Sequence, residues 1–171
     1  MDERGVIRLK LPADLRFRDV AVRLVAEACR LVERTRGALG SMHGPGAAGS
    51  SPGLDLSDRF AAEMVSAVSE IFNNIAIHGY RDRGGGEIAI DVTIAGDHLA
   101  IEIRDHGAAF DISQVPLPEL DKLPEGGMGI HIAKACVDEI DYTPGPPNVW
   151  RMTKYTSGAR RRSRRLSNQP L

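Results

Sequence analysis

The sequence predicts an α+β fold, a two-layer sandwich with helices on one face of a mostly antiparallel sheet. Two observations support this prediction. Short segments with alternating apolar residues, typical of strands, are joined by tight turns, and longer segments carry apolar residues at helical spacing. The chain has 171 residues, enough for one domain with a substantial core. We therefore expect a single domain over residues 1–157.

Four segments are predicted as strands. Residues 6–11 alternate in polarity, and residues 149–155 follow a proline-rich turn. Residues 87–94 and 98–104 also alternate, and they flank Ala95-Gly96-Asp97, a sequence that favours a hairpin turn. Consecutive strands joined by such a short turn must run antiparallel.

Three segments are predicted as helices, at about residues 17–36, 58–78 and 127–140. Ser57 or Asp58 can cap the second helix by accepting a hydrogen bond from its first free N–H groups. The third helix would have apolar residues on one side, namely Ile130, Ala133, Val137 and Ile140.

The remaining segments predict loops and a tail. Residues 37–53 are rich in Gly, Ser and Pro and predict a flexible insertion, and prolines make residues 105–126 irregular. Residues 158–171 contain five arginines and no acid, and predict a disordered, solvated tail. Without these five of the 22 Lys and Arg residues, the 23 acidic residues exceed the basic ones by six. An acidic body argues against direct DNA binding, which needs clustered Lys and Arg.

The sequence predicts a cytoplasmic protein. The two cysteines, Cys29 and Cys136, lie in apolar helical surroundings without metal-site spacing, as expected for small buried side chains in a reducing compartment. The first residues lack an apolar signal-peptide region, and no segment approaches the roughly 18 apolar residues of a membrane span.

The first candidate site lies on the second predicted helix. Glu70, Asn74 and His78 are spaced at i, i+4 and i+8 and therefore share one side of the helix. A polar stripe is the usual exposed face of an amphipathic helix. It can also carry chemistry, because an amide oxygen can bind Mg²⁺ and a carboxylate one turn away can accept a proton from an attacking hydroxyl.

Two glycine-containing motifs follow. Asp105-His106-Gly107 directly follows a predicted strand, where it can be a simple turn or can place a carboxylate beside the exocyclic amine of adenine. Glu-Gly-Gly-Met-Gly-Ile at 125–130 opens a predicted helix, where it can be a flexible turn or can direct N–H groups at phosphates. It is not a Walker A motif, because the Gly-Lys-Ser/Thr ending is absent.

In order and spacing, the three motifs resemble the N, G1 and G2 boxes of the GHKL ATPases, a superfamily that includes gyrases and histidine kinases. They lie at 70–80, 105–111 and 125–130. Their details are most similar to the anti-sigma-factor serine/threonine kinases. The similar features are the His-Gly-Tyr ending of the N box, the Phe-Asp after G1, the short lid and the closing Met-Thr-Lys-Tyr at 152–155. The resemblance covers residues 6–156.

This resemblance implies a role for each residue of the first two motifs. Glu70 would be the catalytic base that activates a substrate serine, and Asn74 would hold Mg²⁺ against the phosphates of ATP. Asp105 would bind the adenine amine, and Gly107 would give the base room. His78 would line the nucleotide site or would only close the helix end.

The resemblance also assigns the third motif. Gly127 and Gly129 would lie against the phosphates, and Met128 and Ile130 would support the lid. The apolar face of the sheet would form the floor of the pocket, at residues that include Ile101 and Ile103.

The implied function is an ATP-dependent serine/threonine protein kinase and anti-sigma factor. It would phosphorylate an anti-anti-sigma protein of the STAS-domain kind, sequester a sigma factor and form a homodimer. One alternative is a non-enzymatic nucleotide-binding regulator. Another is the detached ATPase domain of a histidine kinase, although the only upstream histidine, His43, lies in the Gly-rich segment.

Two features depart from the expected pattern. Ala109 stands where the wider superfamily prefers a second glycine in the G1 box, a change that the anti-sigma branch tolerates. The segment 37–53 is longer than expected and would lie near the partner-binding side.

Overall fold

The computed structural model describes residues 5–40, 58–81, 84–110 and 128–156. Its elements are β1 (Gly5–Pro12), the 3-10 helix η1 (Leu15–Phe17), α1 (Arg18–Gly40), α2 (Arg59–Asn74), the π-helical turn η2 (Ile75–Gly79), β2 (Glu87–Ile94), β3 (His98–Asp105), α3 (Met128–Cys136), β4 (Glu139–Thr143) and β5 (Asn148–Tyr155).

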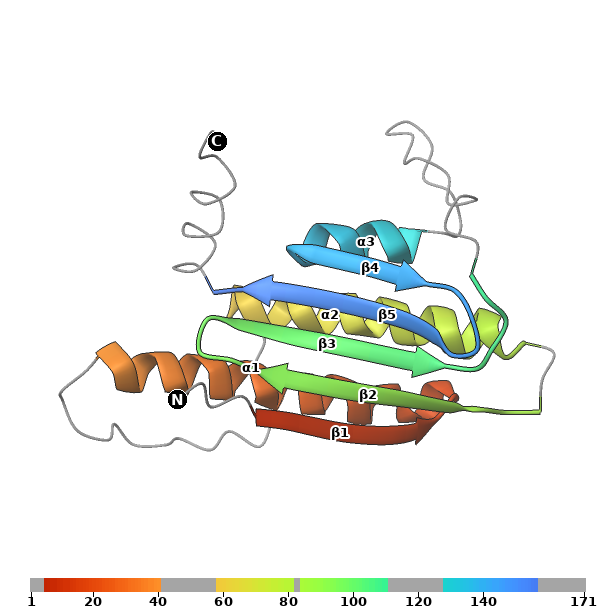
Figure 1. The fold of residues 1–171 in the computed structure, drawn as a ribbon, viewed down its shortest axis with the longest axis horizontal. Helices are drawn as coiled ribbons and strands as arrows, with labels where there is room; N and C mark the ends of the chain where they lie inside the picture. Colours follow the sequence, from red (N-terminus) through yellow and green to blue (C-terminus); the bar gives the residue numbers. More distant parts are fainter. Residues whose placement is uncertain (1–4, 41–57, 82–83, 111–127, 157–171) are drawn as a thin grey trace.

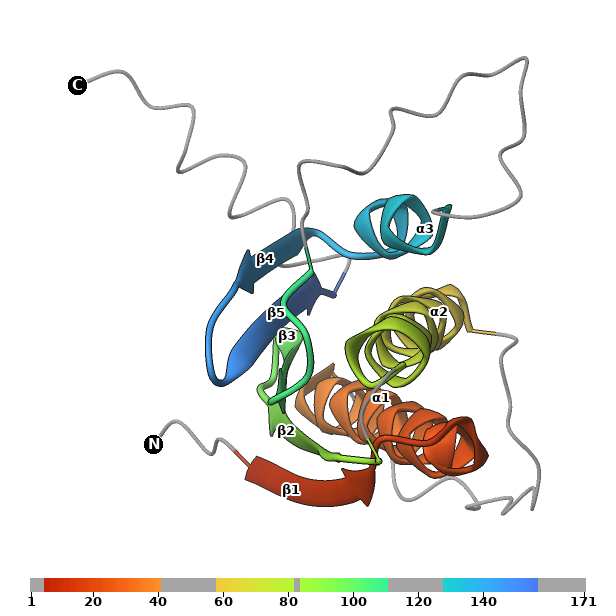
Figure 2. The ribbon, with the colours of Figure 1, turned by 90° about the vertical axis from the view of Figure 1, so that its right-hand side faces the viewer.

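The strands form one antiparallel sheet in the order β1-β2-β3-β5-β4 (Figure 1). All three α-helices cover the same face of this sheet, and α2 lies between α1 and α3 (Figure 2). This arrangement confirms the predicted α+β two-layer sandwich.

The core lies between the sheet and the helices. Inward-facing strand residues and the apolar side of α2 are almost fully buried, including Ile88, Ile90, Leu99, Ile101, Ile103, Met152, Met64, Val68 and Ile71. Alternation along β2 and β3 explains the pattern, because every second residue of a strand points to the same face. No helix in the described parts of the chain is long and apolar enough to cross a bilayer.

The outer face of the sheet is charged. Asp91 on β2 accepts from Arg104 on β3 at 2.7 Å, and Arg151 on β5 donates to Glu102 on β3 at 2.8 Å. Arg104 also pairs with Glu102, which links the two ion pairs into one row. The row explains why β2, β3 and β5 alternate rather than being apolar throughout.

Helix α1 is longer than predicted. It ends at Gly40 rather than near residue 36, so it continues into the predicted flexible segment. Residues 41–53 of that segment, most of the irregular stretch 105–126 and the tail 158–171 lie outside the described residues.

The third helix was predicted too long. It ends at Cys136, and Ile140 lies in β4, opposite Met152 of β5. The prediction was wrong because apolar residues at 133, 137 and 140 fit helical spacing, while the short alternating segment 139–143 needs β5 beside it to pair as a strand. Neither cysteine forms a disulfide; Cys29 is buried as predicted, whereas Cys136, at the helix end, is only half-buried.

Lys154 connects three elements of the fold. It lies on β5, is only 7% exposed, and donates to the carbonyl of Cys136 at the end of α3 at 2.7 Å. Its ammonium also lies 2.5 Å from a carboxylate oxygen of Glu63 on α2. Burial raises the pKa of Glu63, but hydrogen bonds from Lys154 and Arg59 outweigh it, so the net pKa lies below its ordinary value of 4.5.

We predict that Lys154→Met lowers the free energy of unfolding at pH 7 by about 1–3 kcal/mol, because a partly buried carboxylate and a helix-end carbonyl lose their donor. A carboxyl whose folded-state pKa is lowered contributes stability above its unfolded-state pKa and loses it as the pH falls through the folded-state pKa. The difference between wild type and Lys154→Met should therefore shrink as the pH falls below 4.5.

Urea unfolding between pH 3 and pH 7 measures this difference. Arg59→Met is the matched control, because Arg59 binds the same carboxylate from a side chain that is 89% exposed. We expect this control to cost less than about 1 kcal/mol. A pH-independent difference for Lys154→Met would show that the ion pair is not its cause.

Candidate functional site

Helix α2 carries the first group of predicted site residues. Asp58 caps the helix, because its carboxylate accepts from the N–H of Ala61 at 2.8 Å, which confirms one of the two predicted caps. The apolar side of α2 packs on the sheet, so Glu70 and Asn74 occupy the other side, where both are half-buried.

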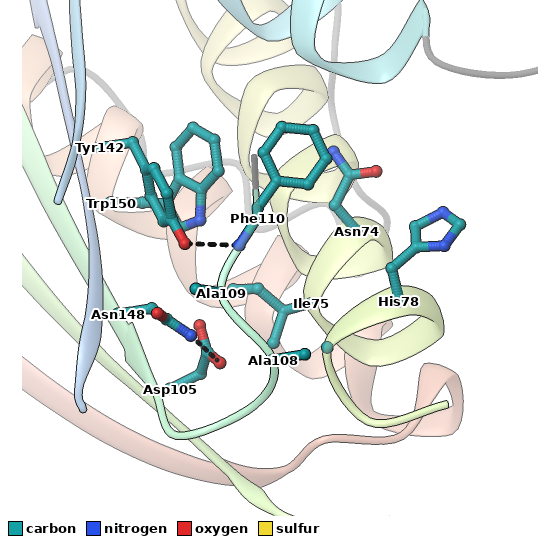
Figure 3. A pocket seen from close by; sticks show the side chains of 11 residues that line it. Asn74, Ile75, His78, Asp105, Ala108, Ala109, Phe110, Tyr142, Asn148 and Trp150 are labelled. Carbon is teal, nitrogen blue, oxygen red and sulfur yellow. Dashed lines mark hydrogen bonds between the residues drawn. The ribbon is translucent and has the colours of Figure 1, made fainter. Parts of the chain in front are cut away.

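The last predicted turn of this helix is π-helical. A π-turn holds more residues than an α-helical turn, so His78 does not continue the regular spacing of Glu70 and Asn74. It is exposed, and it lines the same pocket as Asn74 (Figure 3). The structure therefore brings His78 to the site but changes its predicted register.

Helix α3 begins against α2. A Cβ atom added to Gly129 would lie 2.5 Å from Oε2 of Glu70 and 3.6 Å from Nδ2 of Asn74. Because real Cβ atoms do not come so close, a larger residue at position 129 would require the Glu70 carboxylate to move. The first and third motifs therefore meet at Gly129.

The other residues of the third motif lie in different surroundings. Met128 is half-buried, and Ile130 is buried in the core. Its packing role there is distinct from the lid support that the resemblance implied. Gly127 lies outside the described residues.

Asp105 is the last residue of β3 and is only 2% exposed. Its Oδ1 atom accepts from the N–H of Gly107 at 2.7 Å. The same atom accepts from Nδ2 of Asn148 at 3.1 Å (Figure 3). Within the described ranges, Oδ2 accepts no hydrogen bond. The carboxylate is thus held by one oxygen, while the other is free to bind a ligand.

Position 107 requires glycine for a structural reason that the sequence did not reveal. A Cβ atom there would lie 2.7 Å from the carbonyl oxygen of Gly79 and 2.9 Å from its carbon. The next residue, Ala108, donates its N–H to the same carbonyl at 2.8 Å. The glycine is required because the turn after β3 lies directly against the end of η2.

These elements enclose a pocket with about 390 Å³ of empty space, including the part that opens to solvent. Its lining consists of Asn74, Ile75, His78, Gly79, Asp105, Ala108, Ala109, Phe110, Tyr142, Asn148 and Trp150. Residues from the first and second predicted motifs therefore share one cavity.

Aromatic side chains form one wall of the pocket. The rings of Tyr142 and Trp150 lie 4.3 Å apart, and the Phe110 ring lies 6.2 Å from that of Trp150. The Tyr142 hydroxyl accepts from the N–H of Phe110 at 2.8 Å (Figure 3). Burial raises the pKa of Tyr142, so the hydroxyl stays protonated near neutral pH.

The aromatic wall differs from the pocket floor that was predicted on the apolar face of the sheet. Ile101 and Ile103 are buried in the core and do not line the pocket, because β5 and β4 reach the cavity instead. Tyr142 was missed because β4 was not predicted: its first two residues fall within the predicted helix 127–140, and Tyr142 follows that helix. Asn148 was missed because its place opposite Asp105 follows from the pairing of β3 with β5, which no local pattern reveals.

Asn74 provides a test of the implied magnesium site. Its Nδ2 atom is buried and has no hydrogen-bond partner among the described residues. Rotation of the amide exchanges its nitrogen and oxygen, so the group can offer either atom to a ligand. A magnesium ion bound through phosphates and water needs only one or two oxygens from the protein. Asn74 fits such a role.

Comparisons with known proteins agree with this geometry. The sequence profile of the histidine kinase-like ATPase domain family matches residues 47–154, more than half of the chain. The chain is 31% identical over 106 residues to the serine-protein kinase RsbW of Bacillus velezensis, covering 57% of this chain and 66% of that protein. It is 36% identical over 108 residues to the anti-sigma F factor of Thermoanaerobacter pseudethanolicus, covering 60% of this chain and 75% of that protein.

The solved structure of the RsbU and RsbW domains of Rv1364c from Mycobacterium tuberculosis is also similar. The match is 18% identical, covers 88% of this chain and 31% of that chain, and has a TM-score of 0.46. The chain spans slightly less than two thirds of the RsbW kinases of Bacillus velezensis, Oceanobacillus iheyensis and Bacillus subtilis. Because the sequence profile matches more than half of the chain, the chain belongs to the histidine kinase-like ATPase domain family.

Proposed function

We propose that this protein is an ATP-dependent serine/threonine protein kinase and anti-sigma factor. The observation that supports it best is the pairing of two features in one site. The buried Asp105 carboxylate, with one unused oxygen, lies in a partly aromatic pocket that Asn74 of α2 also lines, and Glu70 lies one turn before Asn74, beside Gly129.

The pocket suits adenine. The base is flat and apolar on its faces, and the pocket offers Phe110, Tyr142 and Trp150 as aromatic surface. Its exocyclic amine is a hydrogen-bond donor, and Oδ2 of Asp105 is a charged acceptor without another partner in the described chain. A purine with an oxygen in place of the amine would meet the carboxylate acceptor to acceptor.

The phosphates would extend from this pocket toward α3. The N–H groups at the start of a helix favour anions, and Gly129 lies at that end of α3, beside Glu70 and Asn74. Asn74 would hold Mg²⁺, which neutralises phosphate charge when bound. Gly127 would add a further N–H group.

Glu70 would act as the general base. The hydroxyl oxygen of the substrate serine forms a bond to the γ-phosphorus of ATP, and the bond from that phosphorus to the β-phosphate oxygen breaks. ADP leaves, and the hydroxyl proton passes to the Glu70 carboxylate. The contact with Gly129 places this carboxylate beside the start of α3.

The partners follow from the relatives and from the resemblance. The names serine-protein kinase and anti-sigma F factor support phosphoryl transfer to a protein and control of a sigma factor. The phosphorylated antagonist would be a STAS-domain anti-anti-sigma protein. We further propose a homodimer that acts in the cytoplasm.

We predict that Glu70→Ala leaves ATP affinity unchanged and lowers phosphoryl transfer by roughly 10²–10⁴-fold, because only the proton acceptor is lost. Asn74→Ala should instead weaken ATP binding in the presence of Mg²⁺ and leave Mg²⁺-free binding unchanged. Calorimetric titration with ATP, with and without Mg²⁺, measures binding, and transfer of ³²P from ATP to purified STAS-domain proteins of the same genome measures activity.

Glu139→Ala is the matched control, because this exposed glutamate lies at the end of β4 away from the pocket. Transfer by Glu70→Ala at the wild-type rate would remove the proposed base. ATP binding without labelling of any STAS-domain protein would favour the non-enzymatic regulator.

We also predict that Asp105→Asn weakens ATP binding by roughly 10–100-fold, because a charged acceptor for the amine is replaced by a donor. The substitution keeps one oxygen for the N–H of Gly107 and for Asn148, so the turn should persist. Inosine triphosphate, which carries an oxygen in place of the amine, should bind no more weakly to Asp105→Asn than to wild type. Equal losses for both nucleotides would contradict the proposed contact.

A further inference from the structure

The His-Gly-Tyr sequence at 78–80 has no role in the proposed chemistry beyond His78, yet its tyrosine is buried at the edge of the site. Strands β2 and β3 pair as far as Ile88 opposite Asp105. One residue further, Glu87 and His106 would face each other if the antiparallel ladder continued.

Tyr80 interrupts the ladder at this point. Its hydroxyl accepts from the N–H of His106 at 2.9 Å and donates to the carbonyl of Glu87 at 3.3 Å. The hydroxyl therefore bridges the two groups that would meet across the next pair. The strands part here, and Asp105 becomes the last residue of β3.

The first three N–H groups of the turn after Asp105 each donate a hydrogen bond. His106 donates to Tyr80, Gly107 donates to the Asp105 carboxylate at 2.7 Å, and Ala108 donates to the carbonyl of Gly79 at 2.8 Å. Two of these three acceptors come from the end of the His-Gly-Tyr sequence. The position of Oδ1 of Asp105, and with it that of Oδ2, thus depends on Gly79 and Tyr80.

Gly86 provides the space for the tyrosine ring. A Cβ atom added there would lie 1.9 Å from Cε1 and 2.2 Å from Cζ of Tyr80. The ring is therefore in direct contact with the backbone just before β2. Any larger residue at position 86 would displace the hydroxyl from the strand end.

We propose that Tyr80 is a positioning residue for nucleotide recognition: by separating β2 from β3 it sets the Asp105 carboxylate toward the exocyclic amine of adenine. The proposal rests on the proposed ATP site. It assigns Tyr80 to base specificity, and it requires no contact between Tyr80 and the nucleotide.

The test compares ATP with inosine triphosphate in Tyr80→Phe by calorimetry at fixed Mg²⁺. The loss of one hydrogen bond to the turn should weaken ATP binding by about fivefold. Inosine triphosphate has no amine for Asp105, so its affinity should not fall, and the preference for ATP should shrink. Tyr155→Phe is the control, because that hydroxyl donates to Glu139 at the opposite end of β5 and should leave the preference unchanged.

Two further measurements guard against a general loss of structure. Gly86→Ala should reduce the preference in the same way, and the double variant should be no worse than Gly86→Ala alone, because both changes remove one interaction. Amide exchange of His106 should accelerate in Tyr80→Phe, whereas that of Ala108, still bound to Gly79, should not.

The outcomes separate the two proposals. A wild-type protein without preference for ATP over inosine triphosphate would overturn the adenine site and the role of Tyr80 together. A wild-type preference that persists in Tyr80→Phe and in Gly86→Ala would overturn the role of Tyr80 alone.

Discussion

Burial of the Asp105 carboxylate is the constraint on which the site depends. Moving an ionised carboxylate out of water is costly unless donors replace the lost hydration. Here the donors come from the turn after β3 and from Asn148 on β5. The strand order that places β5 beside β3 is therefore also what stabilises the charge.

Helix α2 connects the Asp105 turn to the rest of the fold through direct contacts. Its apolar side packs on the sheet, and its other side meets α3 at Gly129, where an added Cβ atom would displace the Glu70 carboxylate. Its π-helical end meets the backbone of the turn after β3, at Gly79 and Gly107. One side-chain contact and one backbone contact thus join three sequence motifs that are far apart along the chain.

Local patterns were sufficient for much of the fold. The hairpin strands were predicted at 87–94 and 98–104, and the structure has them at 87–94 and 98–105, because alternation and turn signals are local. Ser57 and Asp58 were both predicted as possible caps, and the structure has Asp58. The short strand β4 was not, because its five residues, none of them buried, gain strand structure only by pairing with β5. The end of α1 was also misjudged, since glycines lower helix propensity without excluding a helix.

Some residues of the site were likewise predictable from the sequence, and others were not. The sequence by itself determined which residues are candidates for the proposed chemistry, since Glu70, Asn74, Asp105 and Gly129 are recognisable from their order and spacing. Only the tertiary structure decided that Asn148 orients Asp105, that Trp150 and Tyr142 form the wall, and that Tyr80 ends the ladder. The reason is physical. Motif spacing is a property of one continuous segment, whereas the hydrogen bond between β3 and β5 and the position of the Tyr80 hydroxyl between β2 and β3 arise only when distant segments pack together.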